Sequence, residues 1–272
     1  MKKIALFINR KKDPALEVTR RLLATLSGFE LELLGLHSRR DPALEGEIRF
    51  VDQEEFYRAD CIITLGGDGT ILSVAPGAAR QGVPILGINL GKVGFMAEVE
   101  TAELDQIPRL FAGDFSISER MMLEILLPSG EKLITLNECA LSCAGGAHMI
   151  ALSVFEGERK ITDIHADGVL FNTPTGSTGY SLSAGGPVVD PEWDCIGLQS
   201  ICPYGGFAPH MIFSPEAELR AIAETPLLLS ADGREERRIS SGEEIRVRRA
   251  PCKAKLIRLS DRRFYNVFFQ KF

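Results

Sequence analysis

The chain has 272 residues, 45% of them hydrophobic, which is enough for one large or two ordinary globular domains. Its formal net charge of -6 argues against a protein that coats nucleic acid. No apolar stretch approaches the roughly 18 residues that span a membrane, and the N-terminus has too short an apolar core for a signal peptide. We therefore expect a cytoplasmic protein without a nucleic-acid or membrane partner.

The first part of the chain alternates apolar runs with amphipathic stretches. Such alternation predicts a parallel sheet flanked by helices, and we assign residues 1–115 to this α/β domain. Pro76 lies in the helix expected after residue 70, where we expect a kink or an early stop. The expected strands are 4–8, 31–36, 61–65 and a region around 84–88, and the other expected helices are 14–26 and 102–112.

From about residue 117 the pattern changes to strand-length runs separated by turns. This pattern predicts an all-β domain, a sandwich, over residues 116–255, with one short helix over 180–184. The last segment, 256–272, is rich in aromatic residues that need burial, so we expect it to pack back on the first domain, with a neighbouring subunit as the alternative. The expected strands are 122–127, 132–136, 149–155, 169–172, 227–230, 244–247 and 253–259.

A turn with three glycines, GGDGT, follows the buried strand at 61–65. The glycines at 66, 67 and 69 allow backbone NH groups to converge on phosphate oxygens. Asp68 would repel phosphate, so it must face a metal ion, a hydroxyl group or solvent. Alternatively, the segment is an ordinary strand-to-helix turn with Asp68 as the helix N-cap. It is not a dinucleotide fingerprint, because Leu72 stands where a third glycine is required, and no GxxxxGK[ST] loop occurs.

Two further polar segments could bind a ligand. Asn137 and Glu138 interrupt a strand-like stretch, and together they suit a base edge and ribose hydroxyls, although an exposed turn or bulge is the alternative. The stretch 167–190 combines an acid–glycine pair with many hydroxyl groups and glycines, which is typical of a binding wall. Tyr180 could stack on a base or serve as an ordinary packed aromatic. A flexible linker is the alternative for the whole stretch.

With GGDGT at 66–70, Asn-Glu at 137–138 and DGVLFNTPTGSTGYSLSAGGP at 167–187, the chain resembles the NAD kinase family over essentially its whole length. GGDGT alone is shared with diacylglycerol and sphingosine kinases, and the long third motif separates them. The resemblance implies an α/β N-terminal domain, a β-sandwich C-terminal domain, a site where the two meet, and a homo-oligomer, either dimer or tetramer. It also implies phosphoryl transfer from ATP or polyphosphate to the 2′-hydroxyl of the adenosine ribose of NAD, which gives NADP.

The resemblance also implies roles for individual residues. Asp68 would be the catalytic base, and the donor phosphates would lie on Gly66, Gly67, Gly69 and Thr70. Because the motifs contain no lysine or arginine, we expect Mg²⁺ to bridge the donor phosphates, and we assign no residue as a protein ligand of a metal. The residues implied to bind NAD are Phe95, Asn137, Glu138, His165, Asp167, Thr178, Gly179, Tyr180 and Ser183.

Two of these positions depart from the family pattern. Gly179 stands where relatives usually have alanine, and His165 where they often carry arginine or another polar residue.

Two other functions remain open. A lipid kinase is disfavoured by the polar third motif, and an NAD(P)-binding sensor without activity is disfavoured by the presence of Asp68.

Overall fold

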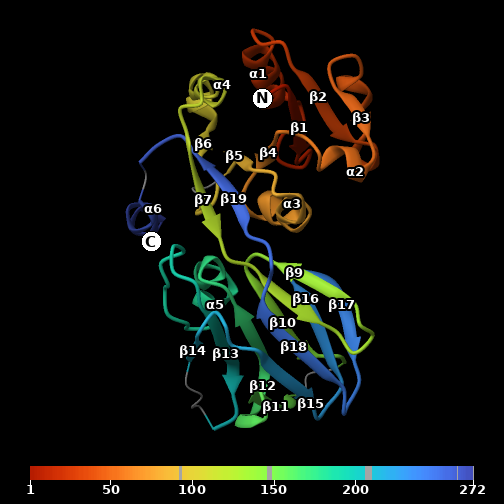
Figure 1. Ribbon diagram of the computed structural model, residues 1–272, viewed down its shortest axis with the longest axis vertical. Helices are drawn as coiled ribbons and strands as arrows, with labels where there is room; N and C mark the ends of the chain where they lie inside the picture. Colours follow the sequence, from red (N-terminus) through yellow and green to blue (C-terminus); the bar gives the residue numbers. More distant parts are fainter. Residues whose placement is uncertain (92–93, 146–148, 206–209, 262, 272) are drawn as a thin grey trace. The chain divides into compact units, whose positions relative to one another are not determined.

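The computed structural model describes residues 1–91, 94–145, 149–205, 210–261 and 263–271. The chain forms two compact units. The first combines Met1–Glu119 with Lys253–Phe272, and the second is Arg120–Cys252 (Figure 1).

The first unit contains the parallel sheet expected from the sequence. Its strands are β1 (Lys3–Ile8), β2 (Glu32–Leu36), β3 (Arg49–Val51), β4 (Cys61–Gly66), β5 (Ile85–Asn89), β6 (Val99–Glu100), β7 (Ser116–Arg120) and β19 (Ala254–Arg258). Their order is β3-β2-β1-β4-β5-β19-β7, with β6 paired to β5. Strands β3, β2, β1, β4, β5 and β19 pair in parallel. The chain runs outward in opposite directions from β1 and β4, and this reversal of strand order is where open α/β sheets bind ligands.

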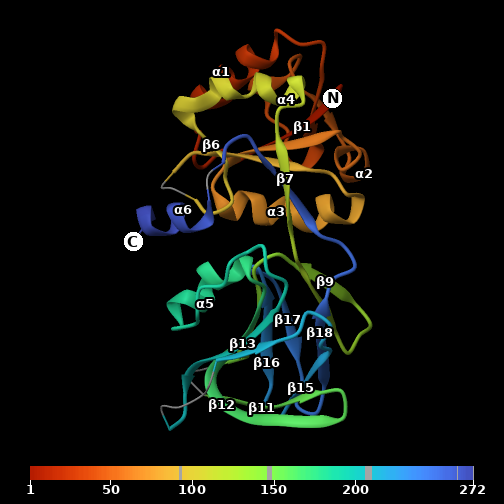
Figure 2. The ribbon, with the colours of Figure 1, turned by 60° about the vertical axis from the view of Figure 1, so that its left-hand side comes forward.

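Helices cover both faces of this sheet. The helices α1 (Glu17–Leu26) and α4 (Pro108–Ala112) lie on one side, and α3 (Asp68–Gln81) lies on the other (Figure 2). The short α2 (Gln53–Phe56) follows β3. The helix expected over 102–112 is instead a 3₁₀ turn, Thr101–Gln106, followed by α4, because Pro108 starts a new helix.

The early stop expected at Pro76 is wrong, since α3 continues to Gln81. A proline inside a helix removes one backbone hydrogen bond. Val74 and Ala78 on either side of it are fully buried, and their packing holds the helix together across this position.

The second unit is built from antiparallel strands. They are β8 (Leu123–Leu126), β9 (Lys132–Thr135), β10 (Glu138–Cys143), β11 (Ile150–Glu156), β12 (Arg159–Asn172), β13 (Ile196–Pro203), β14 (Met211–Phe213), β15 (Leu219–Ala223), β16 (Leu227–Ala231), β17 (Arg234–Ile239) and β18 (Glu244–Arg249). They form one sheet with the central order β17-β16-β10-β12-β11-β15-β18-β8-β9. The helix expected near residue 180 is α5 (Tyr180–Ser183).

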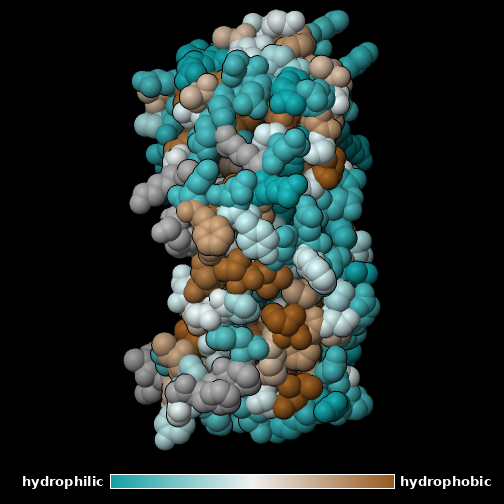
Figure 3. All heavy atoms as spheres, turned by 90° about the vertical axis from the view of Figure 1, so that its left-hand side faces the viewer, coloured by the Kyte–Doolittle hydropathy of each residue, from teal (hydrophilic) through white to brown (hydrophobic). Residues whose placement is uncertain are grey.

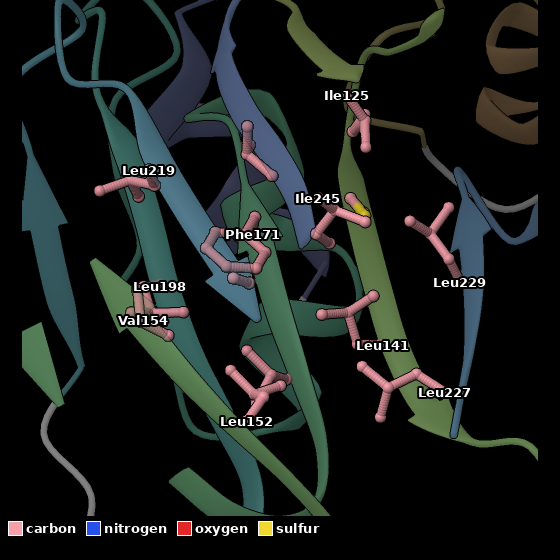
Figure 4. Packing of buried hydrophobic residues seen from close by; sticks show 14 of the residues in the cluster. Ile125, Leu141, Leu152, Val154, Phe171, Leu198, Leu219, Leu227, Leu229 and Ile245 are labelled. Atoms are coloured by element: carbon pink, nitrogen blue, oxygen red, sulfur yellow. The ribbon is translucent and has the colours of Figure 1, made fainter. Parts of the chain in front are cut away.

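One apolar core unites these strands. Alternate residues of each strand point to the same side, so Leu141 of β10, Phe171 of β12 and Ile245 of β18 enter a single buried cluster (Figure 4). Leu229 of β16 and Ile125 of β8 belong to the same cluster, although these strands are far apart in the sheet order. The sandwich expected from the sequence is therefore one continuous hydrogen-bonded sheet that curls around a shared core.

The C-terminal part of the chain returns to the first unit. The strand β19 pairs with β5 through Leu256 and Ile85, so the run at 253–259 belongs to the parallel sheet and not to the β-rich unit. The helix α6 (Phe264–Lys271) follows, and the rings of Phe264 and Phe268 lie 6.1 and 6.2 Å from the ring of Phe95. Phe272 lies outside the described residues.

Candidate active site

The GGDGT turn joins β4 to α3 in the first unit. Gly67 is the N-cap of α3 and Asp68 its first residue. No side chain fits at Gly66, because a Cβ there would collide with the side chain of Thr70. The Thr70 hydroxyl accepts hydrogen bonds from Gly67 N and Asn9 Nδ2, both at 3.3 Å. The glycine and the threonine thus fix the shape of the turn together.

The carboxylate of Asp68 is held away from its own helix. It accepts three backbone hydrogen bonds, from Phe95 N at 2.8 Å, Met96 N at 3.1 Å and Ala97 N at 3.3 Å. A side chain at Gly94 would collide with this carboxylate. The N-cap alternative for Asp68 is therefore wrong, because Gly67 is the cap and Asp68 binds the segment after β5.

A buried acid that the sequence did not single out fixes this segment from its other end. Glu98 accepts hydrogen bonds from Leu259 N at 3.0 Å, from Ser260 N at 2.8 Å and from Ser260 Oγ at 2.6 Å. It also forms an ion pair with Arg258 of β19 at 3.0 Å. Because both ends of the segment are bonded, the orientation of the Asp68 carboxylate is preorganised.

Asn137 and Glu138 lie in the second unit, at the start of β10. Glu138 is only 7% exposed, so the exposed-turn alternative does not hold for it. Asn137 Oδ1 and Glu138 Oε2 are buried, and no group in the described part of the chain forms a hydrogen bond with either atom. A buried acceptor without a donor costs about 1–3 kcal/mol, which is offset when a ligand supplies the donor. Ribose hydroxyls and amino groups are donors of this kind.

Asp232, which nothing in the sequence singled out, positions these two residues. Its carboxylate accepts hydrogen bonds from Leu136 N at 2.9 Å, Asn137 N at 2.7 Å and Glu138 N at 3.2 Å, and from the Thr135 hydroxyl. Burial raises the pKa of Asp232. Its place in an Ala-Asp-Gly turn gave it the appearance of an ordinary turn former, and its partners lie some 95 residues earlier in the sequence.

Burial, and secondarily the charge of Asp232, raises the pKa of Glu138 from 4.5 to about 7. Below pH 4.5 the group is protonated in both the folded and the unfolded chain, and its contribution to stability is fully present. Between pH 4.5 and 7 Glu138 ionises only in the unfolded chain, so the free energy of unfolding falls, by about 3 kcal/mol in total.

We expect Glu138→Gln to remove this loss. The free energy of unfolding in urea without NAD, compared at pH 5 and pH 8, should therefore fall more for the wild type than for the variant. An equal fall in both proteins would contradict the assignment.

The third motif packs against Asn137 and Glu138 within the same unit. Thr173 N donates to Asn137 O at 2.9 Å, and a side chain at Gly176 would collide with the Asn137 backbone. A Cβ at Gly179 would lie 3.3 Å from Gly176 O, 3.4 Å from Asn137 Nδ2 and 3.5 Å from Glu138 Oε2, so the alanine usual in relatives would fit closely there and would need a shift of a few tenths of an ångström. The flexible-linker alternative is wrong, because residues 173–177 are buried.

Two residues further along this motif leave their side chains at the surface, whereas Ser181 between them is buried and Thr178 is half-buried. Tyr180 is 47% exposed and Ser183 is exposed, both on α5. The Thr178 hydroxyl donates to Thr175 O at 3.3 Å, at the end of a 3₁₀ turn, Thr175–Thr178. The exposed Tyr180 ring is not a core aromatic, and it is available to a ligand.

His165 and Asp167 lie elsewhere on the second unit. Both are exposed residues of β12, two positions apart and therefore on the same face. Glu138 pairs with Asn172, five residues further along β12 than Asp167, which is about 17 Å at 3.4 Å per residue. Within this unit the structure does not bring His165 or Asp167 together with Asn137 and Glu138. Phe95 belongs to the first unit, where α6 contacts its ring.

A held carboxylate beside a glycine turn, and an Asn-Glu pair whose buried acceptor atoms are unmet, suit a nucleotide phosphotransferase. Residues 4–115 match the family model of the ATP-NAD kinase N-terminal domain, and residues 136–259 match that of the ATP-NAD kinase C-terminal domain. The chain is 39% identical to the NAD kinase of Symbiobacterium thermophilum, over all of this chain and 99% of the relative. It is 36% identical to that of Moorella thermoacetica, over all of this chain and 89% of the relative. The chain belongs to the NAD kinase family.

Two solved structures share the fold. A yeast NADH kinase complexed with NADH has the same fold, with a TM-score of 0.89 at 23% identity, and the match covers 99% of this chain and 87% of that one. An NAD kinase from Archaeoglobus fulgidus in complex with ATP matches with a TM-score of 0.79 at 25% identity, over 99% of this chain and 98% of that one. Both expected fold classes, the parallel α/β unit and the antiparallel β unit, are confirmed. Over the described residues, no helix is long and apolar enough to cross a membrane.

Proposed function

We propose that this protein transfers a phosphoryl group from ATP, or from polyphosphate, to the 2′-hydroxyl of the adenosine ribose of NAD, with Asp68 as the catalytic base. Membership of the NAD kinase family gives the class of reaction. The observation that carries the mechanism is the Asp68 carboxylate, fixed by three backbone NH groups directly beside the glycine turn. We also propose a cytoplasmic location.

Asp68 is suited to receive the proton of the attacking hydroxyl. Its hydrogen bonds fix the direction of the carboxylate, and a base must be in hydrogen-bond reach of the proton that it accepts. As the ribose oxygen bonds to the γ-phosphorus of ATP, the bond between that phosphorus and the bridging oxygen breaks, and the hydroxyl proton passes to Asp68. The donor phosphates would lie on Gly66, Gly67, Gly69 and Thr70.

The residues present fit a Mg²⁺ ion that arrives on the donor phosphates. Such an ion keeps water and phosphate oxygens as most of its ligands and needs only one or two protein carboxylates. Asp68 has acceptor sites beyond its three hydrogen bonds, because a carboxylate offers about four. When bound, the ion would neutralise charge that builds up on the transferred phosphoryl group. The described residues contain no group of three or more His, Cys, Asp or Glu side chains that could enclose a metal.

The second unit would bind NAD. The unmet acceptors of Asn137 and Glu138 suit the hydroxyl and amino donors of the adenosine part. Gly179 lies beside them, and Thr178, Tyr180 and Ser183 continue the same wall, with the exposed Tyr180 ring free to stack on a base. His165 and Asp167 would contact the dinucleotide at a separate place on this unit.

We further propose that the protein is a homo-oligomer, a dimer or tetramer. Because Asp167 and Glu138 lie far apart along the sheet, they could contact two different NAD molecules or opposite ends of one NAD molecule. Figure 3 shows apolar side chains gathered on one face of the β-rich unit. The same unit also has large exposed side chains, because Trp193, Tyr204 and Ile212 are 73%, 75% and 51% exposed. A molecular mass measurement in solution tests the proposal, and a strict monomer would contradict it.

A panel of donors and acceptors tests the function itself. Purified protein with Mg²⁺, ATP or polyphosphate, and NAD or NADH should give the 2′-phosphorylated dinucleotide. The absence of product with every donor would contradict the proposal. Phosphorylation of a diacylglycerol or a sphingoid base would make the protein a lipid kinase, and tight NAD(P) binding without turnover would make it a sensor.

A further inference from the structure

A lysine outside the three motifs lies over the glycine turn. A Cβ built on Gly67 would lie 2.7 Å from Lys12 Nζ, and one built on Gly91 would lie 3.1 Å from the same atom. The Lys12 side chain is exposed, and it forms no ion pair with any described residue. Its ammonium group therefore lies between two glycine backbones, one after β4 and one after β5.

Hydrogen bonds attach the loop that carries Lys12 to β4, to Thr70 and to α1. Asn9 N donates to Leu65 O at 2.9 Å, which continues the pairing of β1 with β4, and Asn9 Nδ2 donates to Thr70 Oγ1. Lys12 N donates back to Asn9 O at 2.9 Å. The buried carboxylate of Asp13 accepts from Thr19 N at 2.9 Å and Thr19 Oγ1 at 2.6 Å, and so ties the loop to α1. These bonds fix the backbone on both sides of Lys12.

Lys12 also lies at the edge of the sheet where open α/β sheets bind ligands. It follows β1, whereas Gly67 follows β4, and these two strands are the neighbours at which the strand order reverses. Loops from the carboxyl ends of three adjacent parallel strands, β1, β4 and β5, thus converge on one ammonium group. The glycines leave open the space beside it that side chains would fill, and no acid among the described residues forms an ion pair with it.

We infer that Lys12 binds the phosphate chain of the phosphoryl donor. The inference rests on the proposed function, and it adds a positively charged donor-binding residue to motifs that contain neither lysine nor arginine. An ammonium group is a strong donor to phosphate oxygens, and it screens the charge of the phosphates next to Asp68. The triphosphate of ATP and inorganic polyphosphate share this chemistry.

The test compares Lys12→Ala with Lys11→Ala. Lys11 is the neighbouring exposed lysine, and its backbone NH bonds to Asn9 Oδ1, so its replacement controls for charge and for the loop. We expect Lys12→Ala to raise the KM for the donor by about 10- to 100-fold, the usual loss for a hydrogen bond between charged groups, and to leave the KM for NAD within about twofold. Lys12→Arg should restore part of the affinity, and Lys11→Ala should resemble the wild type.

Parallel titrations with ATP and polyphosphate identify the source of the phosphate chain, because the effect should appear with whichever donor the wild type uses. An unchanged donor KM in Lys12→Ala would overturn the inference. So would a rise confined to the KM for NAD, which would place Lys12 on the acceptor instead.

A binding measurement separates this inference from the proposed function. Inorganic tripolyphosphate should raise the melting temperature of the wild type and of Lys11→Ala, and should raise that of Lys12→Ala much less. If the wild type forms no NADP with any donor, the proposed function fails, and this measurement still decides whether Lys12 belongs to a phosphate site. Equal stabilisation of all three proteins would refute that role.

Discussion

Replacing Asp68 by asparagine should lower kcat by about 10²- to 10⁴-fold, the range that general-base catalysis supplies. Asparagine keeps the shape of the side chain but cannot accept the proton of the ribose hydroxyl. The affinity for NAD should stay near that of the wild type, because Asp68 belongs to the first unit and the proposed adenosine contacts belong to the second. Steady-state kinetics of NADP formation, combined with calorimetric titration of NAD, would measure both quantities.

The change also has a structural cost that must be separated from catalysis. In the variant an NH₂ group takes the place of one carboxylate oxygen, and it would face a backbone NH such as that of Phe95. The loss of this hydrogen bond should lower the free energy of unfolding by about 1–3 kcal/mol.

Asp60→Asn is a matched control for this change. Asp60 precedes β4, as Asp68 follows it, and one of its oxygens accepts from Lys2 N at 2.6 Å and from Lys3 N at 3.0 Å. An asparagine oxygen can serve both donors, so activity should be unchanged. A well-folded Asp68→Asn enzyme with more than about a tenth of the wild-type kcat would show that another group is the base.

The sequence was informative wherever local pattern determines structure. The alternation of strands and helices in residues 1–115 predicted a parallel sheet, and the strand-length runs separated by turns after residue 117 predicted an all-β domain, because turn residues mark where short elements end. GGDGT was recognisable as a turn with an unusual acid. The sequence could not show that this acid turns away from its helix, since its partners, Phe95 to Ala97, lie nearly thirty residues later.

Residues with distant partners escaped prediction for the same reason. Lys12 is one of two adjacent lysines in an unremarkable loop, and only the pairing of β1 with β4 brings it over Gly67. Glu98 is one acid among several, and its partners come from the last residue of β19 and the two residues after it, more than 150 residues later. The strand at 253–259 has the pattern of its antiparallel predecessors, so periodicity could not assign it to the parallel sheet. In each case tertiary contacts, rather than local preference, give the residue its role.

Asp232 gives the second large expected effect, because one carboxylate orients the whole Asn137–Glu138 segment. Asp232→Ala would leave three backbone NH groups without their acceptor and would leave the Thr135 hydroxyl only its second acceptor, Glu138 O, and should lower the free energy of unfolding by about 3 kcal/mol or more. Asp232→Asn is the sharper variant. It keeps one oxygen for Thr135, Asn137 and Glu138 and loses the acceptor of Leu136, so the unit should stay folded while NAD affinity falls by about tenfold.

The pH dependence of NAD binding distinguishes positioning from simple structural support. Ionised Glu138 accepts hydrogen bonds from ribose hydroxyls, so the wild type should bind NAD more weakly as the pH falls through about 7. Removal of the Asp232 charge lowers the pKa of Glu138, and in Asp232→Asn this weakening should therefore begin at a lower pH. The control Glu131→Gln removes an exposed carboxylate of the same unit that pairs with Arg237, and it should leave the profile unchanged. If Asp232→Asn lost affinity equally at every pH, its charge would not act on Glu138, and Asp232 would be only a structural support of the turn.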